Sequence, residues 1–262
     1  MGKTDRKVLY IVIPAYNESE NIRDVIQEWY PVVEKHRAGG KSRLVVIDDG
    51  SRDTTYSIVK EEMKHRPLLT GLTKENGGHA PACMYGYRYA LEHGADYIFQ
   101  TDSDGQTKAS EFEPFWRAAH KYDVVMGYRR KRGDGFSRLL VSRTLRVVIR
   151  LMFHTDVLDA NVPYRLMRAD VLEDSMRLVP PDYLLGNVVL SVVFQKKHVK
   201  VKFLPVSFVP RQGGASMYNW RRIFGIGINS LKEFASINQM IDGRINIINT
   251  TDTKPRRFRR KR

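Results

Sequence analysis

Short apolar runs alternate with amphipathic stretches along the first half of the chain. The runs are four to six residues long and rich in β-branched side chains, which is typical of buried parallel strands. They lie at 8–13, 43–47, 68–72, 97–101 and 124–127. Helices are expected to begin near Asn17 or Ser19, at Asp53, after Gly78 and near Ser110. This alternation predicts an α/β fold whose central sheet is mostly parallel and doubly wound.

The second half of the chain has a less regular pattern. Leu139–Phe153 predicts a helix whose arginines, three or four residues apart, share one face. Val199–Phe208 predicts a strand that Pro205 could interrupt, and 220–240 predicts an amphipathic helix. Core packing would explain both helices, and so would contact with a membrane surface.

No internal repeat or internal boundary stands out, so a single domain is expected. We assign it to residues 1–240 and expect the basic stretch 241–262 to be a disordered tail. The first residues lack the apolar core of a signal peptide, and no run reaches the roughly 18 apolar residues that a spanning helix needs. Cys83 is the only cysteine, so no intramolecular disulfide can form, which fits a reducing cytoplasm.

The positive charge of the chain is concentrated in two stretches. The net charge is +15, from 44 Lys and Arg against 29 Asp and Glu. Arg129–Arg150 holds eight basic residues and one acid, and Lys254–Arg262 holds seven basic residues, so together they give +14. The rest of the chain is nearly neutral, which argues against a nucleic-acid-binding protein. Charge concentrated in two stretches favours particular anionic partners.

Polar clusters follow three of the predicted strands. They are Pro14–Glu18, Asp48–Ser51 and Asp102–Gln106. In a doubly wound sheet the ligand lies beyond the carboxyl ends of the strands, so the three clusters are expected to meet at one site.

The segment Asp102-Ser103-Asp104-Gly105-Gln106 has the chemistry of a metal site. Its carboxylate and amide oxygens suit Mg²⁺ or Mn²⁺, which would bridge two phosphates of a substrate. The alternative is an Asx-rich turn that caps the next helix.

The second of these clusters, and a fourth one at Asn76–Gly78, each allow a functional and a structural interpretation. Asp48 and Asp49 could accept hydrogen bonds from a base or a ribose, or Ser51 or Asp53 could cap the following helix. Asn76-Gly77-Gly78 would let the backbone approach a ligand, although close helix packing alone would explain it.

The four clusters, in this order and at these spacings, resemble glycosyltransferase family 2. The likeness spans about 7–235 and is to the branch of dolichol-phosphate mannose synthase and bacterial polyprenyl-phosphate sugar transferases. It implies a single-domain GT-A fold, a Rossmann-like nucleotide-sugar-binding fold, with amphipathic helices toward the C-terminus. It also implies an enzyme that uses Mg²⁺ or Mn²⁺ and a nucleotide-sugar donor.

The resemblance also implies residue roles. Residues expected at the nucleotide-sugar are Pro14, Tyr16, Glu18, Asp48 or Asp49, Asn76, Gly78, Asp102, Ser103, Arg129, Arg211 and Ser216. Metal ligands are expected to be Asp102, Asp104 and Gln106. Asp104, Arg129, Arg211 and Asp159 are the expected catalytic residues, because arginine forks suit phosphate oxygens and Asp159 is the best candidate for a base.

The acceptor side departs from the branch pattern. Val162 stands where glycine is usual, Pro163 is unusual, and Asn187 falls where an acid is often found. An ionised phosphate acceptor needs cations and no base, which favours a polyprenyl phosphate at the cytoplasmic face of an anionic membrane. A sugar-accepting hydroxyl of a lipid-linked glycan or capsule chain is the alternative.

A nucleotidyltransferase is disfavoured, because Pro14–Glu18 lacks the Gly-rich basic loop of that class. A homo-oligomer or a membrane-protein partner stays open.

Overall fold

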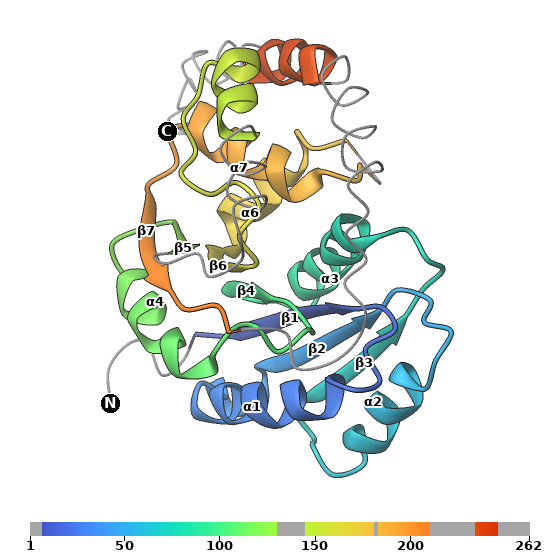
Figure 1. Cartoon of the computed structure of the whole chain (residues 1–262). Helices are drawn as coiled ribbons and strands as arrows, with labels where there is room; N and C mark the ends of the chain where they lie inside the picture. Colours follow the sequence, from blue (N-terminus) through green and yellow to red (C-terminus); the bar gives the residue numbers. More distant parts are fainter. Residues whose placement is uncertain (1–6, 130–144, 181–182, 210–233, 246–262) are drawn as a thin grey trace, which may run out of the picture.

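A seven-stranded sheet forms the centre of the protein (Figure 1). The computed structural model describes residues 7–129, 145–180, 183–209 and 234–245. The sheet order is β3-β2-β1-β4-β6-β5-β7. The strands are β1 (Leu9–Ala15), β2 (Arg43–Asp48), β3 (Leu69–Thr73), β4 (Tyr97–Thr101), β5 (Val124–Arg129), β6 (Tyr164–Arg168) and β7 (Val201–Val206).

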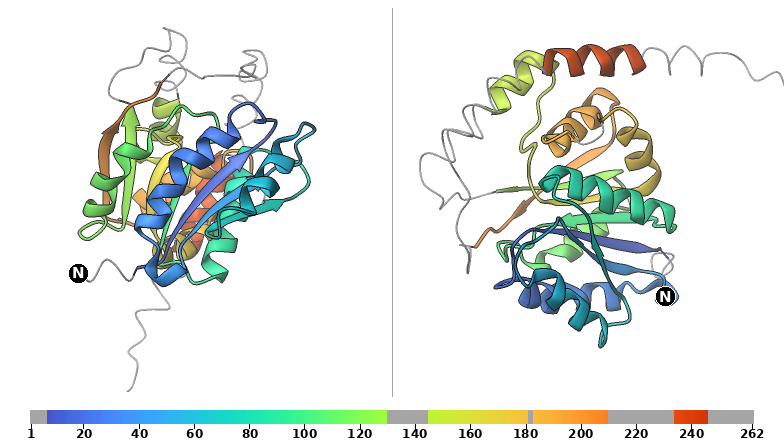
Figure 2. Two further views of the ribbon diagram at one scale, coloured as in Figure 1. Left: turned by 90° about the horizontal axis from the view of Figure 1, so that it is seen from below. Right: turned by 90° about the vertical axis from the view of Figure 1, so that its right-hand side faces the viewer.

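Helices cover both faces of the sheet, as Figure 2 shows in its right-hand view. The labelled helices are α1 (Ile22–Lys35), α2 (Thr55–Met63), α3 (His79–Glu92), α4 (Phe112–Ala118), α6 (Ala169–Met176) and α7 (Gly186–Lys196). α1, α2 and α4 lie on one face, and α3, α6 and α7 lie on the other. The expected GT-A-like α/β fold is therefore confirmed.

All strands except β6 run in the same direction. β1 pairs in parallel with β2 and β4, β2 with β3, and β5 with β7, whereas β6 is antiparallel to both β4 and β5. The carboxyl ends of six strands therefore lie along one edge of the sheet. This arrangement brings the three polar clusters of the sequence to the same edge.

The hydrophobic pattern of the sequence does not predict β6 and α6. β6 has the sequence Tyr-Arg-Leu-Met-Arg. With two arginines in five residues, this segment does not have the apolar pattern of a buried strand. Its first four residues are nevertheless buried, because Arg165 finds hydrogen-bond acceptors inside the protein. A strand inserted between β4 and β5 against their direction also breaks the simple parallel alternation.

β1 extends two residues beyond the run 8–13 and includes Pro14. The carbonyl of Ala15 accepts a hydrogen bond from Asp49 N on the β2 side, so Pro14 faces the β4 side. Pairing of β1 with β4 ends at Val12, opposite Gln100, so no ladder bond is lost at the proline. Pro205 is tolerated in β7 because that strand lies at the edge of the sheet.

Helix starts differ from the expected ones. α1 begins after Asn21, whose side-chain amide donates to Glu18, and neither Asn17 nor Ser19 caps it. Asp53 lies two residues before α2 and accepts from Thr55 N at 2.9 Å. The expected helix at 110–120 is a short 3-10 turn followed by α4.

α3 packs closely on β1 and β2, as its small residues predict. A Cβ on Gly86 would lie 2.4 Å from Val12 Cγ1 and 3.1 Å from Ile47 Cγ1. Any larger side chain would push the helix off the sheet. This contact fixes the N-terminal end of α3 above the carboxyl edge.

Two further helical stretches, at 145–153 and 234–245, lie side by side at one end of the molecule (Figures 1 and 2). Phe153 meets Phe234 edge-on with ring centroids 5.2 Å apart, and Lys196 Nζ on α7 binds Asp242 at 2.5 Å. The second stretch continues past residue 240. The described part of each predicted helix is confirmed, while 139–144 and 220–233 lie outside the described residues. Residues 241–245 are helical, which corrects the expectation that they belong to a disordered tail: Ile241 is buried and Asp242 binds Lys196. The buried Phe234 belongs to the core.

Within the described ranges, no helix is both long and apolar enough to cross a membrane.

Candidate active site

The loop after β1 is joined to the loop after β2 by hydrogen bonds from backbone N–H groups to side-chain oxygens. Asn17 N donates to Ser51 Oγ at 2.9 Å, and Arg52 N donates to Asn17 Oδ1 at 2.8 Å. Asn17 has a φ of 53°, a conformation that asparagine tolerates better than most residues. Together with the bond from Asp49 N to Ala15 O, these bonds fix the backbone on either side of Tyr16, whose side chain is partly exposed.

Asp53 also holds these two loops together, through bonds to Ser19 and Thr55. Its carboxylate accepts from Ser19 N at 3.1 Å and from both N and Oγ1 of Thr55, while Thr55 Oγ1 accepts from Glu18 N at 2.8 Å. Partial burial raises the pKa of Asp53, but the hydrogen bonds from Thr55 and Ser19 outweigh it and lower the pKa. Asp53 is therefore an ionised brace of the predicted nucleoside side.

Asp48 and Asp49, at the end of β2, are both 2% exposed. Asp48 accepts from Thr73 Oγ1 at 2.8 Å and from Ser51 N at 3.3 Å. These bonds tie the carboxyl end of β2 to that of β3. A nucleoside group would therefore have to share a carboxylate that protein donors already bind.

Asp49 organises the glycine loop before α3. Its carboxylate accepts from Lys74 Nζ at 2.6 Å, Gly77 N at 3.0 Å and Gly78 N at 2.7 Å. Asn76 closes the loop from the other side, because its Nδ2 donates to the Asp49 carbonyl at 2.9 Å. Asn76 and Gly78 thus have structural roles beside any contact with a ligand.

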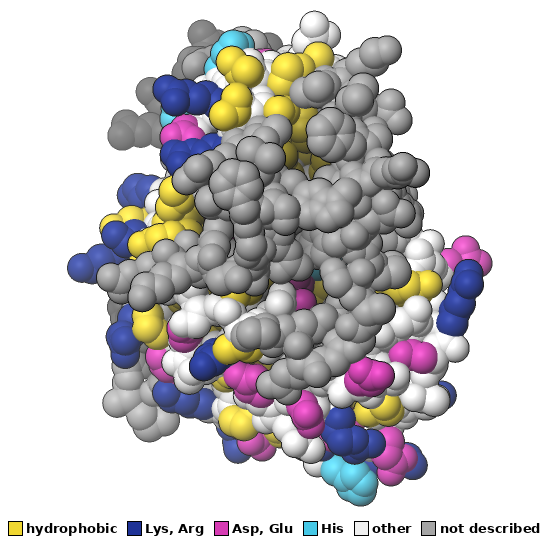
Figure 3. Space-filling view, viewed as in Figure 1, with side chains coloured by type: hydrophobic (Ala, Val, Ile, Leu, Met, Phe, Trp, Pro, Cys, Tyr) yellow, Lys and Arg dark blue, Asp and Glu magenta, His cyan; other side chains and the backbone are white. Residues whose placement is uncertain are grey.

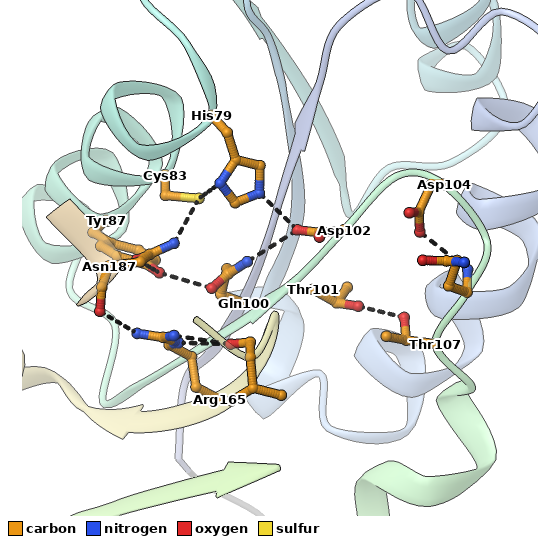
Figure 4. A network of polar contacts seen from close by, with 12 residues as sticks. His79, Cys83, Tyr87, Gln100, Thr101, Asp102, Asp104, Thr107, Arg165 and Asn187 are labelled. Carbon is orange, nitrogen blue, oxygen red and sulfur yellow. Dashed lines mark hydrogen bonds and ion pairs between the residues drawn. The ribbon is translucent and has the colours of Figure 1, made fainter. Parts of the chain in front are cut away.

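Hydrogen bonds join the two ends of the loop after β4 and connect this loop to the chain after β7. The hydroxyls of Thr101 and Thr107 lie 2.6 Å apart, and Gln106 N donates to Asp104 Oδ1 at 3.1 Å (Figure 4). Val209 N donates to the Gln106 carbonyl at 2.9 Å. The expected metal loop is therefore a fixed turn, with Ser103 buried inside it.

Asp102 is held through one oxygen and keeps the other open. Its Oδ1 accepts from His79 Nε2 at 2.8 Å and from Gln100 Nε2 at 3.2 Å, and its side chain is 25% exposed (Figure 4). In the part of the chain that the structure describes, no protein donor binds Oδ2. An aspartate oriented in this way fits a hard divalent cation.

The protein supplies only part of a coordination shell. Among the described residues, no group of three or more His, Cys, Asp and Glu side chains could hold a metal by itself. Two aspartates and the amide of Gln106 fit a cation that takes its remaining oxygen ligands from substrate phosphates and water. The assignment of Asp102, Asp104 and Gln106 as metal ligands stays a prediction.

A ring of polar side chains lies behind Asp102, and sequence reasoning missed it. His79 Nδ1 is 3.9 Å from Cys83 Sγ, Asn187 Nδ2 donates to that sulfur at 3.6 Å, and the Tyr87 hydroxyl bridges Asn187 and Gln100 (Figure 4). The sequence offered two partial signals, a histidine directly after the glycine pair and Asn187 at a position where the branch often has an acid.

The charges around His79 affect its pKa. Desolvation lowers it, but the neighbouring Cys83 and Asp102 outweigh this effect and raise the pKa of His79 well above its usual value. The histidine side chain is nevertheless 49% exposed.

Arg165 is fully buried and binds carbonyl oxygens. It donates to Val162 O at 2.8 Å, Ala160 O at 3.3 Å and Asn187 O at 3.2 Å. The guanidinium therefore shapes the segment before β6 and joins it to α7. The unusual Val162 is itself buried and accommodated in this turn.

The remaining predicted residues lie at the same edge or outside the described ranges. Arg129 is the last residue of β5, opposite Val206 of β7. Asp159 is half-buried and precedes β6, whose first residue, Tyr164, pairs with Thr101. Arg211 and Ser216 lie outside the described residues, in the chain that follows Val209.

Curated proteins similar to this chain are sugar transferases. It is 25% identical to an undecaprenyl-phosphate 4-deoxy-4-formamido-L-arabinose transferase of Pectobacterium atrosepticum over 85% of this chain and 66% of that protein. An uncharacterized glycosyltransferase of Bacillus subtilis is 25% identical over 89% of this chain and 69% of that protein. This chain thus spans about two thirds of the length of the relatives it matches.

Solved structures with a similar fold include glucosyl-3-phosphoglycerate synthase of Mycobacterium tuberculosis. Its complex with uridine diphosphate superposes with a TM-score of 0.60 at 18% identity, covering 89% of this chain and 80% of that one. A complex of the same enzyme with Mn²⁺ and uridine-diphosphate-glucose has a TM-score of 0.62 at 16% identity, over 89% and 79% of the two chains.

A family profile covers more than half of the chain. The profile of Glycosyl transferase family 2 matches residues 10–175, from β1 to the end of α6. The match includes the loops after β1, β2 and β4 that meet at the carboxyl edge. The chain therefore belongs to Glycosyl transferase family 2 and is a glycosyltransferase.

Proposed function

We propose that this enzyme is an inverting, metal-dependent hexosyltransferase that moves a sugar from a GDP- or UDP-linked donor to a polyprenyl phosphate at a membrane surface. The observation that carries the proposal is the open oxygen of Asp102 in a closed loop at the carboxyl edge. On one side of it lie the braced loops expected at the nucleoside. On the other side lies the segment before β6, expected at the acceptor.

The donor side is supported by preorganisation. Asp49 and Asp53 hold the loops after β1, β2 and β3 in place before any ligand binds, so little ordering remains to oppose binding. Similar structures contain uridine diphosphate or uridine-diphosphate-glucose with Mn²⁺ or Mg²⁺, which makes this a chemically consistent donor class. Asp102, Asp104 and Gln106 would hold the cation.

The proposed reaction is a single displacement at the anomeric carbon. An oxygen of the acceptor phosphate donates a lone pair to that carbon, and the bond to the donor diphosphate breaks with its electron pair on the leaving oxygen. A bound Mg²⁺ or Mn²⁺ would neutralise charge on the two leaving phosphates. Arg129 and Arg211 would bind the same oxygens through their guanidinium forks.

The acceptor assignment follows from the relatives and from charge. The relatives from Pectobacterium and Edwardsiella are named as undecaprenyl-phosphate transferases. An ionised phosphate needs no general base, so under this proposal Asp159 would orient the acceptor and would not remove a proton. The basic stretch Arg129–Arg150, which begins at the last residue of β5, would attract that anion.

Membrane contact is supported by an exposed apolar pair. Val147 and Leu151 lie one turn apart on the stretch 145–153 and are 55% and 68% exposed, whereas Ile149 and Phe153 on the same stretch are buried. Hydrophobic side chains are visible at this end of the molecule beside Lys and Arg (Figure 3). One face of the helix thus serves the core and the other is free to enter a headgroup layer.

Thermal unfolding with a panel of UDP- and GDP-sugars tests the donor class. We expect Tm to rise by roughly 5–10 °C at about a hundred times Kd for one nucleotide class only, with Mn²⁺ present. The matched controls are the same sugars with EDTA and the free sugars without a nucleotide. Equal Tm for all ligands and both metal conditions would refute a nucleotide-sugar enzyme.

Transfer assays with two acceptors then test the acceptor class. With the identified donor, radiolabelled sugar should pass to undecaprenyl phosphate and not to undecaprenol, which shares the lipid and lacks the phosphate. Transfer to a lipid-linked glycan, with none to undecaprenyl phosphate, would instead establish the hydroxyl-acceptor alternative.

Liposome flotation tests the membrane surface. Deleting residues 254–262 should remove a salt-sensitive part of binding to anionic vesicles, because the Debye length falls from about 10 Å at 0.1 M to about 3 Å at 1 M. Replacing Val147 and Leu151 together by Asp should remove a salt-insensitive part. Equal flotation of all three proteins would exclude both elements, and nucleotide-sugar affinity should change in none.

A further inference from the structure

His79 occupies a position that the expected roles leave unassigned. It is the first residue of α3, and the glycine loop that Asp49 braces comes directly before it. α3 in turn cannot move toward or away from the sheet without disturbing the contact of Gly86 with Val12. The position of the imidazole is therefore set by a helix that is held by the glycine loop before it and by its packing on the sheet.

The imidazole and Gln100 together determine the direction of the Asp102 carboxylate. Nε2 of His79 and Nε2 of Gln100 both point at Oδ1, at 2.8 Å and 3.2 Å, from two different elements, α3 and β4 (Figure 4). Two donors on one oxygen restrict rotation of the carboxylate and leave Oδ2 to face the loop. Partners of this kind orient metal ligands and raise affinity for the ion.

The supporting ring continues behind both donors. Gln100 is fixed by the Tyr87 hydroxyl at 3.2 Å, and His79 contacts Cys83, which receives a hydrogen bond from Asn187. Gln100 and Tyr87 are fully buried, whereas His79 is half-exposed. Of the two residues that hold Asp102, only His79 can thus be changed without opening the core.

We propose that His79 is a positioning residue that orients Asp102 for the divalent cation and so sets the affinity of the enzyme for that cation. The proposal rests on the function proposed above. It assigns His79 no contact with the reacting atoms. Its effect is transmitted through the Nε2–Oδ1 hydrogen bond alone.

Side-chain length provides a sharp test. In glutamine the terminal nitrogen is four bonds from Cα, as Nε2 is in histidine, whereas in asparagine it is three bonds away. His79→Gln can therefore restore the bond to Asp102, and His79→Asn keeps an amide that is too short. His79→Ala removes the donor, and His93→Ala, at the other end of α3, is the matched control.

The primary measurement is Mn²⁺ binding in the presence of saturating UDP or GDP, followed by the electron paramagnetic resonance signal of free Mn²⁺. We expect the Kd for Mn²⁺ to rise about tenfold or more in His79→Ala and His79→Asn and by about threefold or less in His79→Gln. His93→Ala should match the wild type. At saturating Mn²⁺, kcat should recover in all variants while the half-saturating Mn²⁺ concentration stays raised.

Three outcomes would overturn the proposal. One is an unchanged Kd for Mn²⁺ in His79→Ala, and another is equal weakening by Asn and Gln. The third is a loss of nucleotide affinity in metal-free buffer, which would mean that the imidazole contacts the donor directly. If His79→Ala fails to fold, the comparison of Asn with Gln decides. A wild-type enzyme that binds no Mn²⁺ with either nucleotide would instead refute the proposed function as well.

Discussion

Asp48 and Asp49 at the end of β2 and Asp102 after β4 have similar positions and opposite surroundings. Asp48 and Asp49 are buried, and both bind donors from the protein at close range. Asp102 is a quarter exposed and presents an oxygen that no described donor binds. Acidic residues at the carboxyl edge thus divide into two kinds: Asp48 and Asp49 hold neighbouring loops in place, and Asp102, which we propose as a metal ligand, keeps one oxygen open.

The largest expected effect concerns the ligand side. Asp104→Asn should lower kcat/KM by about a thousandfold, because several kcal/mol of charge stabilisation on the leaving diphosphate would be lost. Transfer rates at saturating Mn²⁺ measure this effect, and an unchanged Tm serves as the folding control. Near-normal turnover of this variant with EDTA present would exclude the metal role.

The next effect concerns the braces. Asp49→Ala should lower the free energy of unfolding by about 3 kcal/mol, since it leaves Lys74 and two backbone N–H groups without their buried acceptor. Asp49→Asn keeps an acceptor oxygen and should lose less. Urea unfolding of the three proteins measures the difference. If Asp49→Ala lost activity and kept its stability, Asp49 would act on a ligand and would not serve to hold the loops.

A smaller effect is expected from the arginines. Alanine at Arg129 or Arg211 should reduce kcat/KM by about ten- to a hundredfold, and lysine should reduce it less, because lysine keeps the charge and loses the fork. Steady-state kinetics of the four variants test this ranking. Wild-type values in both alanine variants would refute the assignment.

The smallest effect is pH-dependent. The pKa of Asp53 is lowered in the folded protein, so its ionised form stabilises the fold above the ordinary pKa of about 4. This contribution is lost as the pH falls through the lower folded value. Asp53→Asn should therefore unfold more easily than the wild type at pH 7, and the two should converge in acid. A difference in Tm that stays constant from pH 7 to pH 3 would contradict the ionised brace.

The sequence by itself determined the parallel α/β fold and the segments that form the site. Local hydrophobic runs specify strands, and ligands of such sheets bind at the carboxyl ends, so the order of runs and polar clusters alone predicts that the loops after β1, β2 and β4 meet. The close packing of α3 could also be predicted, because a small residue such as Gly86 allows the helix backbone to approach the sheet closely.

Only the tertiary structure decided which polar groups are free and which are used. The pairs Asp49–Lys74 and Asp102–His79 join residues 25 and 23 positions apart, and no local pattern encodes such contacts. For the same reason β6 was missed: its Arg165 reads as a surface residue until carbonyls of the neighbouring turn satisfy it. Burial and hydrogen-bond partners are properties of the assembled chain, since they depend on elements that meet only after folding.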